Sequence, residues 1–201
     1  MFFNKPFVLA SSSNSRYKIL KNNHLFFTVK KPMCDEGLLK NKLIKKKIPA
    51  KKISLELARL KSKSISKLNK NKLVVGSDTV IELNGALLSK VKNLEEAKKK
   101  LIKMSGKEHS LYSSASVFIN QREVWKKTQK TKIKIRKLSS LEIDEYILKN
   151  KKNILQAVGC YQVEIAGPNI IENIKGDFFN VMGFPLFPFL VFLKKYKYPK
   201  I

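Results

Sequence analysis

Cysteine and histidine are scarce in this chain of 201 residues, which contains two of each. Cys34 and Cys160 show neither metal-ligand spacing nor the framework of a disulfide-rich protein. With only His24 and His109 available, a histidine-based zinc site or a catalytic triad is nearly excluded. The simplest interpretation is a protein of the reducing cytoplasm.

Arginine is also rare, although lysine and arginine together number 42 against 15 acidic residues. Arginine occurs only at Arg16, Arg59, Arg122 and Arg136. The net charge of +27 favours polyanionic partners: nucleic acid, membrane surfaces or phosphate-rich small molecules. The scarcity of arginine argues against sequence-specific reading of DNA. A coding bias that enriches lysine, asparagine and isoleucine explains the charge equally well.

Long hydrophobic runs are absent. The most apolar segment, 178–193, is interrupted by Gly183, Pro185 and Pro188, which makes it too broken to span a bilayer comfortably. The first residues lack the continuous apolar region and the cleavage site of a secretory signal. We therefore expect no membrane partner.

The pattern of apolar residues predicts a mixed α/β fold without regular βαβ repetition. Strands are expected at 6–10, 25–30, 73–81, 111–119, 132–137, 162–165 and 170–174. Helices are expected at 16–22, 55–68, 94–104, 140–149 and 185–196, and the lysine-dense segment 40–52 is expected to be a solvated loop or helix surface. Asn84-Gly85 is a strong signal for a hairpin turn.

Asp78 is the most informative residue, because it lies in the middle of the apolar segment 74–81. Burying a carboxylate there is costly unless the group is paired or binds a metal. Two interpretations stay open: a general base or metal ligand at the centre of a sheet, or a strand residue that faces solvent.

The serine-rich turn at 11–15 joins a strand to a helix and forms a candidate phosphate cradle. Hydroxyl groups, N–H groups at a helix N-terminus and the Arg16 guanidinium suit an anion. Serine-rich turns that only cap helices are equally common. The glycine patterns of P-loop and dinucleotide-binding proteins are absent.

Other polar residues carry weaker signals. Asp35 and Glu36 are metal-ligand candidates or acids of a surface turn. Asp177 is a turn cap or a second acid. Nothing intrinsic distinguishes Lys61 or Lys90 from the other lysines.

Five segments resemble, in order and over nearly the whole chain, the motifs of the Maf family of nucleoside triphosphate pyrophosphatases. They are 9–20, 57–61, 75–90, 97–109, and 159–164 together with 175–186. One segment alone would be weak, whereas five in order are specific. The resemblance implies a single domain over residues 1–201, a mixed α/β fold with an elongated curved sheet flanked by helices, and a central cleft between two lobes.

The resemblance also implies hydrolysis of a nucleoside triphosphate to a monophosphate and pyrophosphate, with Mg²⁺ or Mn²⁺ as cofactor. Asp78 falls on the position of the catalytic proton acceptor, and Glu36 falls on an acid near the metal, so both are expected metal ligands. The expected phosphate-binding residues are Ser11, Arg16, Lys61 and Lys90.

Some positions depart from the family pattern. Asn14 and Ser15 replace a proline and an arginine, and Ser113 stands where many members have threonine. Ser15, Thr79 and Glu164 fall on specificity positions. Thr79 resembles the branch that cleaves dTTP and UTP, whereas Glu164 resembles the branch that cleaves 7-methyl-GTP or a broader set of nucleotides. No single base is therefore predicted.

The main alternative is a basic nucleic-acid-binding protein without catalysis. It explains only the charge, and it predicts lysines gathered on one face with aromatic residues between them. A regulatory role in cell division is a further alternative and is compatible with catalysis. We expect a nucleoside triphosphate substrate, no specific nucleic-acid partner, a cytoplasmic location and, from the resemblance, a homodimer.

Overall fold

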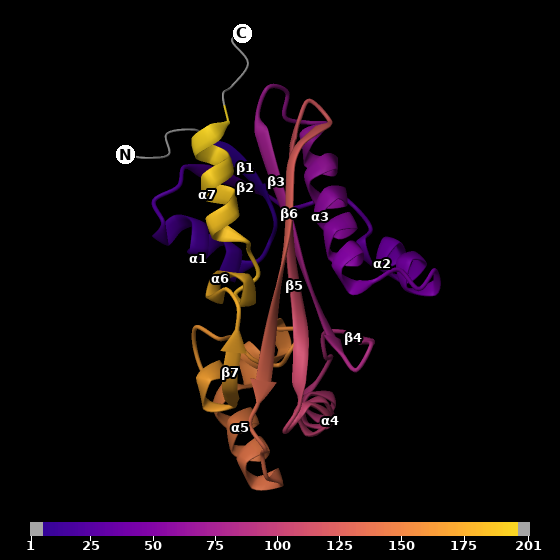
Figure 1. The fold of residues 1–201 in the computed structure, drawn as a ribbon, viewed down its shortest axis with the longest axis vertical. Coiled ribbons are helices and arrows are strands. Elements are labelled where there is room, and N and C mark those ends of the chain that lie inside the picture. Colours follow the sequence, from indigo (N-terminus) through magenta and orange to yellow (C-terminus); the bar gives the residue numbers. More distant parts are fainter. Residues whose placement is uncertain (1–5, 197–201) are drawn as a thin grey trace. The chain divides into compact units, whose positions relative to one another are not determined.

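The computed structural model describes residues 6–196 (Figure 1). The chain forms two compact units. Unit 1 comprises Met1–Thr79, Ser113–Gln129 and Gly183–Ile201, and unit 2 comprises Val80–Tyr112 and Lys130–Met182. The strands are β1 (Phe7–Ala10), β2 (Phe27–Lys30), β3 (Leu73–Leu83), β4 (Ala86–Leu88), β5 (Glu108–Ile119), β6 (Arg122–Ile135) and β7 (Ile171–Lys175). The helices are α1 (Asn14–Asn22), α2 (Glu36–Lys45), α3 (Ala50–Ser66), α4 (Leu94–Met104), α5 (Ser140–Gln156), the 3₁₀ turn η1 (Gly167–Asn169), α6 (Phe178–Val181) and α7 (Leu186–Lys195).

The strands form one mixed sheet in the order β2-β1-β3-β5-β6-β7, with β4 paired to β3. β1 pairs in parallel with both of its neighbours, so that Phe7 lies opposite Phe27 on β2 and opposite Leu73 on β3. All four residues of β1 are buried, and a continuous apolar sequence is typical of a parallel strand covered on both faces. β3 with β4 and β6 with β7 are antiparallel pairs.

Helix α3 packs closely against β3 in unit 1. Its buried side chains recur every four positions, at Ile53, Leu57, Lys61 and Ile65. A Cβ atom at Gly76 of β3 would lie 2.3 Å from the carbonyl oxygen of Ala58, so only glycine allows this approach. Lys61 therefore lies on the helix face that packs on the sheet, although it is a charged residue.

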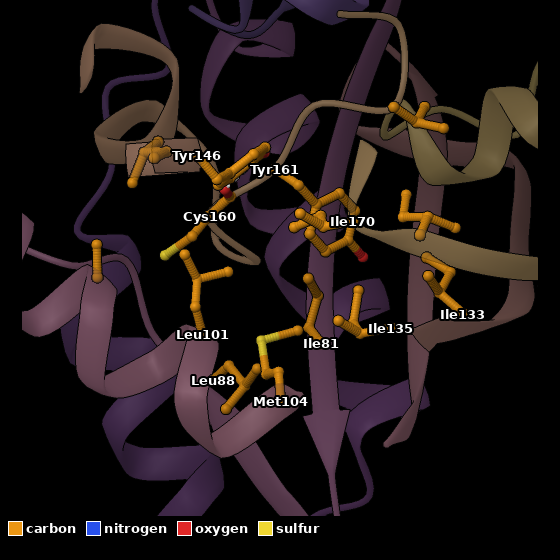
Figure 2. Close-up of a cluster of buried hydrophobic side chains, with 14 of the residues drawn as sticks. Ile81, Leu88, Leu101, Met104, Ile133, Ile135, Tyr146, Cys160, Tyr161 and Ile170 are labelled. Atoms are coloured by element: carbon orange, nitrogen blue, oxygen red, sulfur yellow. Dashed lines mark hydrogen bonds between the residues drawn. The ribbon is translucent and has the colours of Figure 1, made fainter. Parts of the chain in front are cut away.

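A cluster of buried hydrophobic side chains forms the core of unit 2 (Figure 2). Figure 2 shows Leu101 and Met104 of α4 in the same cluster as Ile81 of β3 and Ile135 of β6. The buried α4 residues follow the helical period. On β6, the buried Ile133 and Ile135 alternate with the exposed Lys132 and the half-buried Lys134, as expected for a strand with one buried face.

The expectation of a mixed α/β fold with a sheet flanked by helices is confirmed. Helix α4 has the predicted bounds, and the Asn84-Gly85 turn joins β3 to β4 with φ values of 51° and 77°. Both residues have the positive φ that a tight hairpin turn requires. The interpretation of residues 1–201 as one domain of two lobes stays a prediction.

Several elements differ from the sequence-based expectation: α3 begins at Ala50 instead of residue 55, and α5 continues to Gln156 instead of ending at residue 149. No strand forms over residues 162–165, of which 163–165 lie in turns. The N–H groups of Ile165 and Gly167 both donate to the carbonyl of Gln162. β6 begins at Arg122 instead of residue 132, because its first half has polar side chains that hide the strand pattern. In the lysine-dense segment 40–52, where a loop and a helix surface were both expected possibilities, residues 40–45 belong to a regular helix that begins at Glu36 and is capped by the Asp35 carboxylate.

Among residues 6–196, every helix is either too short or too polar to cross a membrane.

Candidate active site

The serine-rich turn follows β1 and leads into α1. Ser13 is the N-cap of α1, and its side chain accepts a hydrogen bond from the Arg16 backbone N–H at 3.5 Å. Ser11 is buried, and its Oγ accepts from the Ser13 N–H at 3.2 Å. The capping interpretation is therefore correct for Ser13, and the turn also places the Ser11 hydroxyl near the N-terminus of α1.

The Arg16 side chain is buried and bonds three different partners in unit 1. Its Nε donates to the carbonyl of Gly183 at 2.9 Å, Nη1 to Ser11 Oγ at 3.2 Å, and Nη2 to Thr79 Oγ1 at 3.1 Å. A guanidinium has five N–H donors, so donors remain for a ligand. Burial lowers the pKa of Arg16, while the charges of Asp78 and Glu36 act in the opposite direction.

Lys61 lies at the centre of a second group of charges in unit 1. Its Nζ is 2.7 Å from Asp78 Oδ1, 2.9 Å from Glu36 Oε2 and 3.4 Å from the carbonyl oxygen of Ser77. Lys61 is 6 % exposed and Asp78 is 9 % exposed, so the pair is largely withdrawn from water. The interpretation of Asp78 as a solvent-facing strand residue is therefore wrong, and the buried carboxylate is paired, as its environment requires.

Glu36 reaches this group from the first turn of α2. Its side chain is 44 % exposed, in contrast to the buried Asp78. The two acids come from elements far apart in sequence, and both bind the same ammonium group. Glu36 thus lies between solvent and the buried pair.

The two carboxylates also fit the donor chemistry of a divalent cation. Residues 6–196 contain no group of three or more histidine, cysteine, aspartate or glutamate side chains that is arranged to hold a metal. Mg²⁺, however, is usually bound through one or two carboxylates, with waters and substrate phosphates completing its coordination. Asp78 and Glu36 each bond Lys61 through one oxygen and keep a second oxygen for such a cation.

Two residues identified as site candidates from the sequence lie in unit 2. Lys90 is exposed and follows β4, and Glu164 is half-buried in the turn segment before η1. Ser15 is half-buried on α1 of unit 1. The structure therefore brings together six of the candidates in unit 1: Ser11, Arg16, Glu36, Lys61, Asp78 and Thr79. The roles of all these residues stay predictions.

Gly183 is a part of this site that the sequence did not single out. Its carbonyl oxygen accepts from Arg16 Nε, from Ser77 Oγ at 3.1 Å and from Thr79 Oγ1 at 3.4 Å. Gly183 has a φ of +107°, a backbone conformation that L-residues with side chains rarely adopt. The sequence shows only a glycine directly before a Phe-Pro pair. Because the accepting atom is a backbone carbonyl oxygen, which every residue has, the residue type does not predict its role.

Comparison with known proteins identifies the family. Residues 6–196 match the family model described as Maf-like protein. The chain is 39 % identical over 190 residues to the 7-methyl-GTP pyrophosphatase of Bartonella henselae, covering 94 % of this chain and 95 % of that protein. It is 33 % identical over 189 residues to the nucleoside triphosphate pyrophosphatase of Caulobacter vibrioides, with 94 % of each covered. It is also 36 % identical over 190 residues to the nucleoside triphosphate pyrophosphatase of Pelagibacter ubique, covering 94 % and 97 %. The chain belongs to the Maf family.

Proposed function

We propose that this protein is a nucleoside triphosphate pyrophosphatase, which hydrolyses the bond between the α and β phosphates to yield a nucleoside monophosphate and pyrophosphate. Membership of the Maf family and the names of its relatives support this activity and not the non-catalytic alternative. The observation in the structure that carries the proposal is the buried Lys61–Asp78 pair with Glu36, in the same unit as the Ser11–Arg16 turn.

Asp78 is the proposed general base. Lys61 holds Asp78 Oδ1 at 2.7 Å and so fixes the orientation of the carboxylate. The second oxygen has two lone pairs, so one can bind the proposed cation while the other accepts a proton from the attacking water. Such general-base assistance typically contributes ~10²–10⁴-fold to the rate. Attack by water must occur against the concentrated negative charge of the triphosphate, so cationic groups around the phosphates are also required.

The turn that starts α1 supplies the proposed phosphate site. The Ser11 hydroxyl and the N–H groups at the helix N-terminus are donors for phosphate oxygens, and the macrodipole of the helix favours an anion there. The Arg16 guanidinium adds a fixed positive charge beside them. Lys61 and, in unit 2, Lys90 are proposed as further phosphate-binding residues.

Glu36 and Asp78 are the residues that would hold the proposed divalent cation. Bound Mg²⁺ or Mn²⁺ would neutralise charge on the phosphate oxygens. The carboxylates' own part is to supply hard oxygen ligands, of which Asp78 is fixed by Lys61 and Glu36 is accessible from solvent.

The nucleobase preference is proposed to depend on Ser15, Thr79 and Glu164. Relatives named for 7-methyl-GTP and relatives named for nucleoside triphosphates in general resemble this chain to a similar degree. We therefore propose a nucleoside triphosphate substrate without naming one base.

We further propose that the protein is a cytoplasmic homodimer with no specific nucleic-acid partner. The free thiols of Cys34 and Cys160 are compatible with a reducing compartment. Light scattering coupled to size-exclusion chromatography measures the oligomeric state directly, and a monomer at micromolar concentration would contradict the dimer.

The experiment that tests the activity is product analysis. The purified protein is incubated with a panel of canonical and modified nucleoside triphosphates, with Mg²⁺ or Mn²⁺, and the products are separated by ion-exchange chromatography. We expect a nucleoside monophosphate and pyrophosphate in equal amounts. A nucleoside diphosphate with orthophosphate would place the cut at the β–γ bond and contradict the proposal.

A further inference from the structure

The hydroxyl group of Thr79 is held by several polar groups of unit 1. Arg16 Nη2 donates to it at 3.1 Å, Ser113 Oγ lies 2.8 Å from it, and the Gly183 carbonyl oxygen lies 3.4 Å from it. Because Arg16 can only donate, Thr79 uses an oxygen lone pair for that bond. The hydroxyl proton of Thr79, or that of Ser113, then makes the bond between the two hydroxyl groups.

The distances identify Ser113 as the neighbour that sets the orientation of Thr79. An O–H···O bond is usually 2.7–2.8 Å long, so the Ser113 contact is close to ideal and the Gly183 contact is long. The Gly183 carbonyl also accepts from Arg16 and from Ser77. Ser113 is fully buried on β5, at 0 % exposure, so its hydroxyl does not rotate away into water.

We propose that Ser113 is a positioning residue for nucleotide selection, because its hydroxyl holds the Thr79 hydroxyl in the orientation that discriminates between nucleobases. This inference rests on the proposed pyrophosphatase function and on the proposed role of Thr79 in specificity. Ser113 itself touches Thr79 and acts through it.

The next residue on β5 provides a matched control. Ser114 is as deeply buried as Ser113, but its hydroxyl bonds Ser54 and Thr128, each at 2.7 Å, instead of Thr79. Ser113→Ala and Ser114→Ala therefore remove the same atom from neighbouring positions with the same burial. Only the first change affects Thr79.

The test compares kcat and KM for a panel of nucleoside triphosphates in the wild-type protein and both variants. We expect Ser113→Ala to change the ratio of kcat/KM between the best nucleotide and its competitors by roughly 2- to 10-fold, the effect of one hydrogen bond. The change should fall on KM, since a contact to the base is made in the ground state and the transition state alike. Ser114→Ala should lower the melting temperature and leave the ratio unchanged.

Two further variants complete the test. Ser113→Thr keeps the hydroxyl and should keep the wild-type preference. In a Thr79→Val background, Ser113→Ala should cause no additional change in preference, because the hydroxyl that it positions is already gone. If circular dichroism shows that Ser113→Ala is unfolded, Ser113→Cys, which is similar in size and a weak hydrogen-bonding group, replaces it.

The outcomes separate this inference from the proposed function. An active wild-type protein whose preference is unchanged in Ser113→Ala, or changed equally in Ser114→Ala, overturns the role of Ser113 alone. A wild-type protein that releases pyrophosphate from no nucleotide of the panel overturns the proposed function, and the inference with it.

Discussion

Lys61 is the residue whose replacement tests the electrostatics of the site most sharply. Lys61→Met keeps an unbranched apolar side chain at this buried position of α3 and removes the ammonium group. Asp78 then keeps its charge at a position where its side chain is only 13 % exposed, without the cation that lies 2.7 Å away in the wild-type protein. Glu36 loses the same partner, but its side chain is 44 % exposed and is hydrated.

The expected cost therefore arises almost entirely at Asp78. Removing one partner of a buried ion pair typically destabilises a protein by about 3–5 kcal/mol, because an uncompensated charge is left behind. Exposed surface charges usually contribute less than about 1 kcal/mol. Lys63→Met, on the solvent-facing side of the same helix, is the matched control and should change the free energy of unfolding by less than about 0.5 kcal/mol.

Urea denaturation followed by circular dichroism measures both variants. The double variant Lys61→Met/Asp78→Asn removes the charge together with its partner, so it should be more stable than Lys61→Met alone by about 1–3 kcal/mol. Equal stabilities of the Lys61→Met and Lys63→Met variants would refute the reasoning. A double variant whose loss equals the sum of the two single losses would show that Lys61 and Asp78 do not interact.

Three further changes probe the mechanism, a buried histidine and the packing of the sheet. Asp78→Asn should fold and lose ~10²–10⁴-fold in kcat, because an amide cannot accept the proton of the attacking water. The control Asp177→Asn alters the N-cap of α6 and should keep its activity in the same pyrophosphate assay. Burial lowers the pKa of His109 to about 4, below its usual 6.5. Between pH 6.5 and pH 4 the unfolded chain therefore binds more protons than the folded protein, so the free energy of unfolding decreases as the pH falls through this range. Urea titrations should show a loss of about 3 kcal/mol over that window, reduced in His109→Gln and retained in the exposed variant His24→Asn. Gly76→Ala places a Cβ atom 2.3 Å from a carbonyl oxygen of α3 and should lower the melting temperature by more than 10 °C, and a wild-type melting curve would contradict the close packing.

The sequence predicted correctly one helix whose ends carry a capping residue, charges that suit the helix dipole and a terminating glycine. Asn93 caps α4 through its side chain, two glutamates occupy the first turn and Gly106 follows its end with a φ of +68°, so the bounds of this helix were predicted correctly. A cap was one of the two roles left open for Asp177, and its carboxylate accepts from the Asn180 N–H at 2.9 Å. The segment 162–165 was misjudged, because a short alternation of polar and apolar residues also occurs in a turn whose hydrogen bonds are local.

The candidate site was predictable where a residue type is unusual for its position. Asp78 is a carboxylate within an apolar strand, and Arg16 is a guanidinium directly after the serine-rich turn between a strand and a helix. Lys61 was identified only through the family resemblance, because residue type and spacing alone do not distinguish one lysine from the many others. Its burial follows from the packing of α3 on β3, which depends on the absence of a side chain at Gly76. The role of the Gly183 carbonyl group could not be predicted either, because every residue has a backbone carbonyl group.

The central claim is that water activated by Asp78 attacks the α-phosphorus of a nucleoside triphosphate. The most direct test is hydrolysis in water enriched in ¹⁸O, followed by mass spectrometry of the separated products. Attack at the α-phosphorus should place one ¹⁸O atom in the nucleoside monophosphate and none in the pyrophosphate. Label in the pyrophosphate would mean attack at the β-phosphorus, and label in orthophosphate released together with a diphosphate would mean attack at the γ-phosphorus. Either result would rule out the proposed attack at the α-phosphorus.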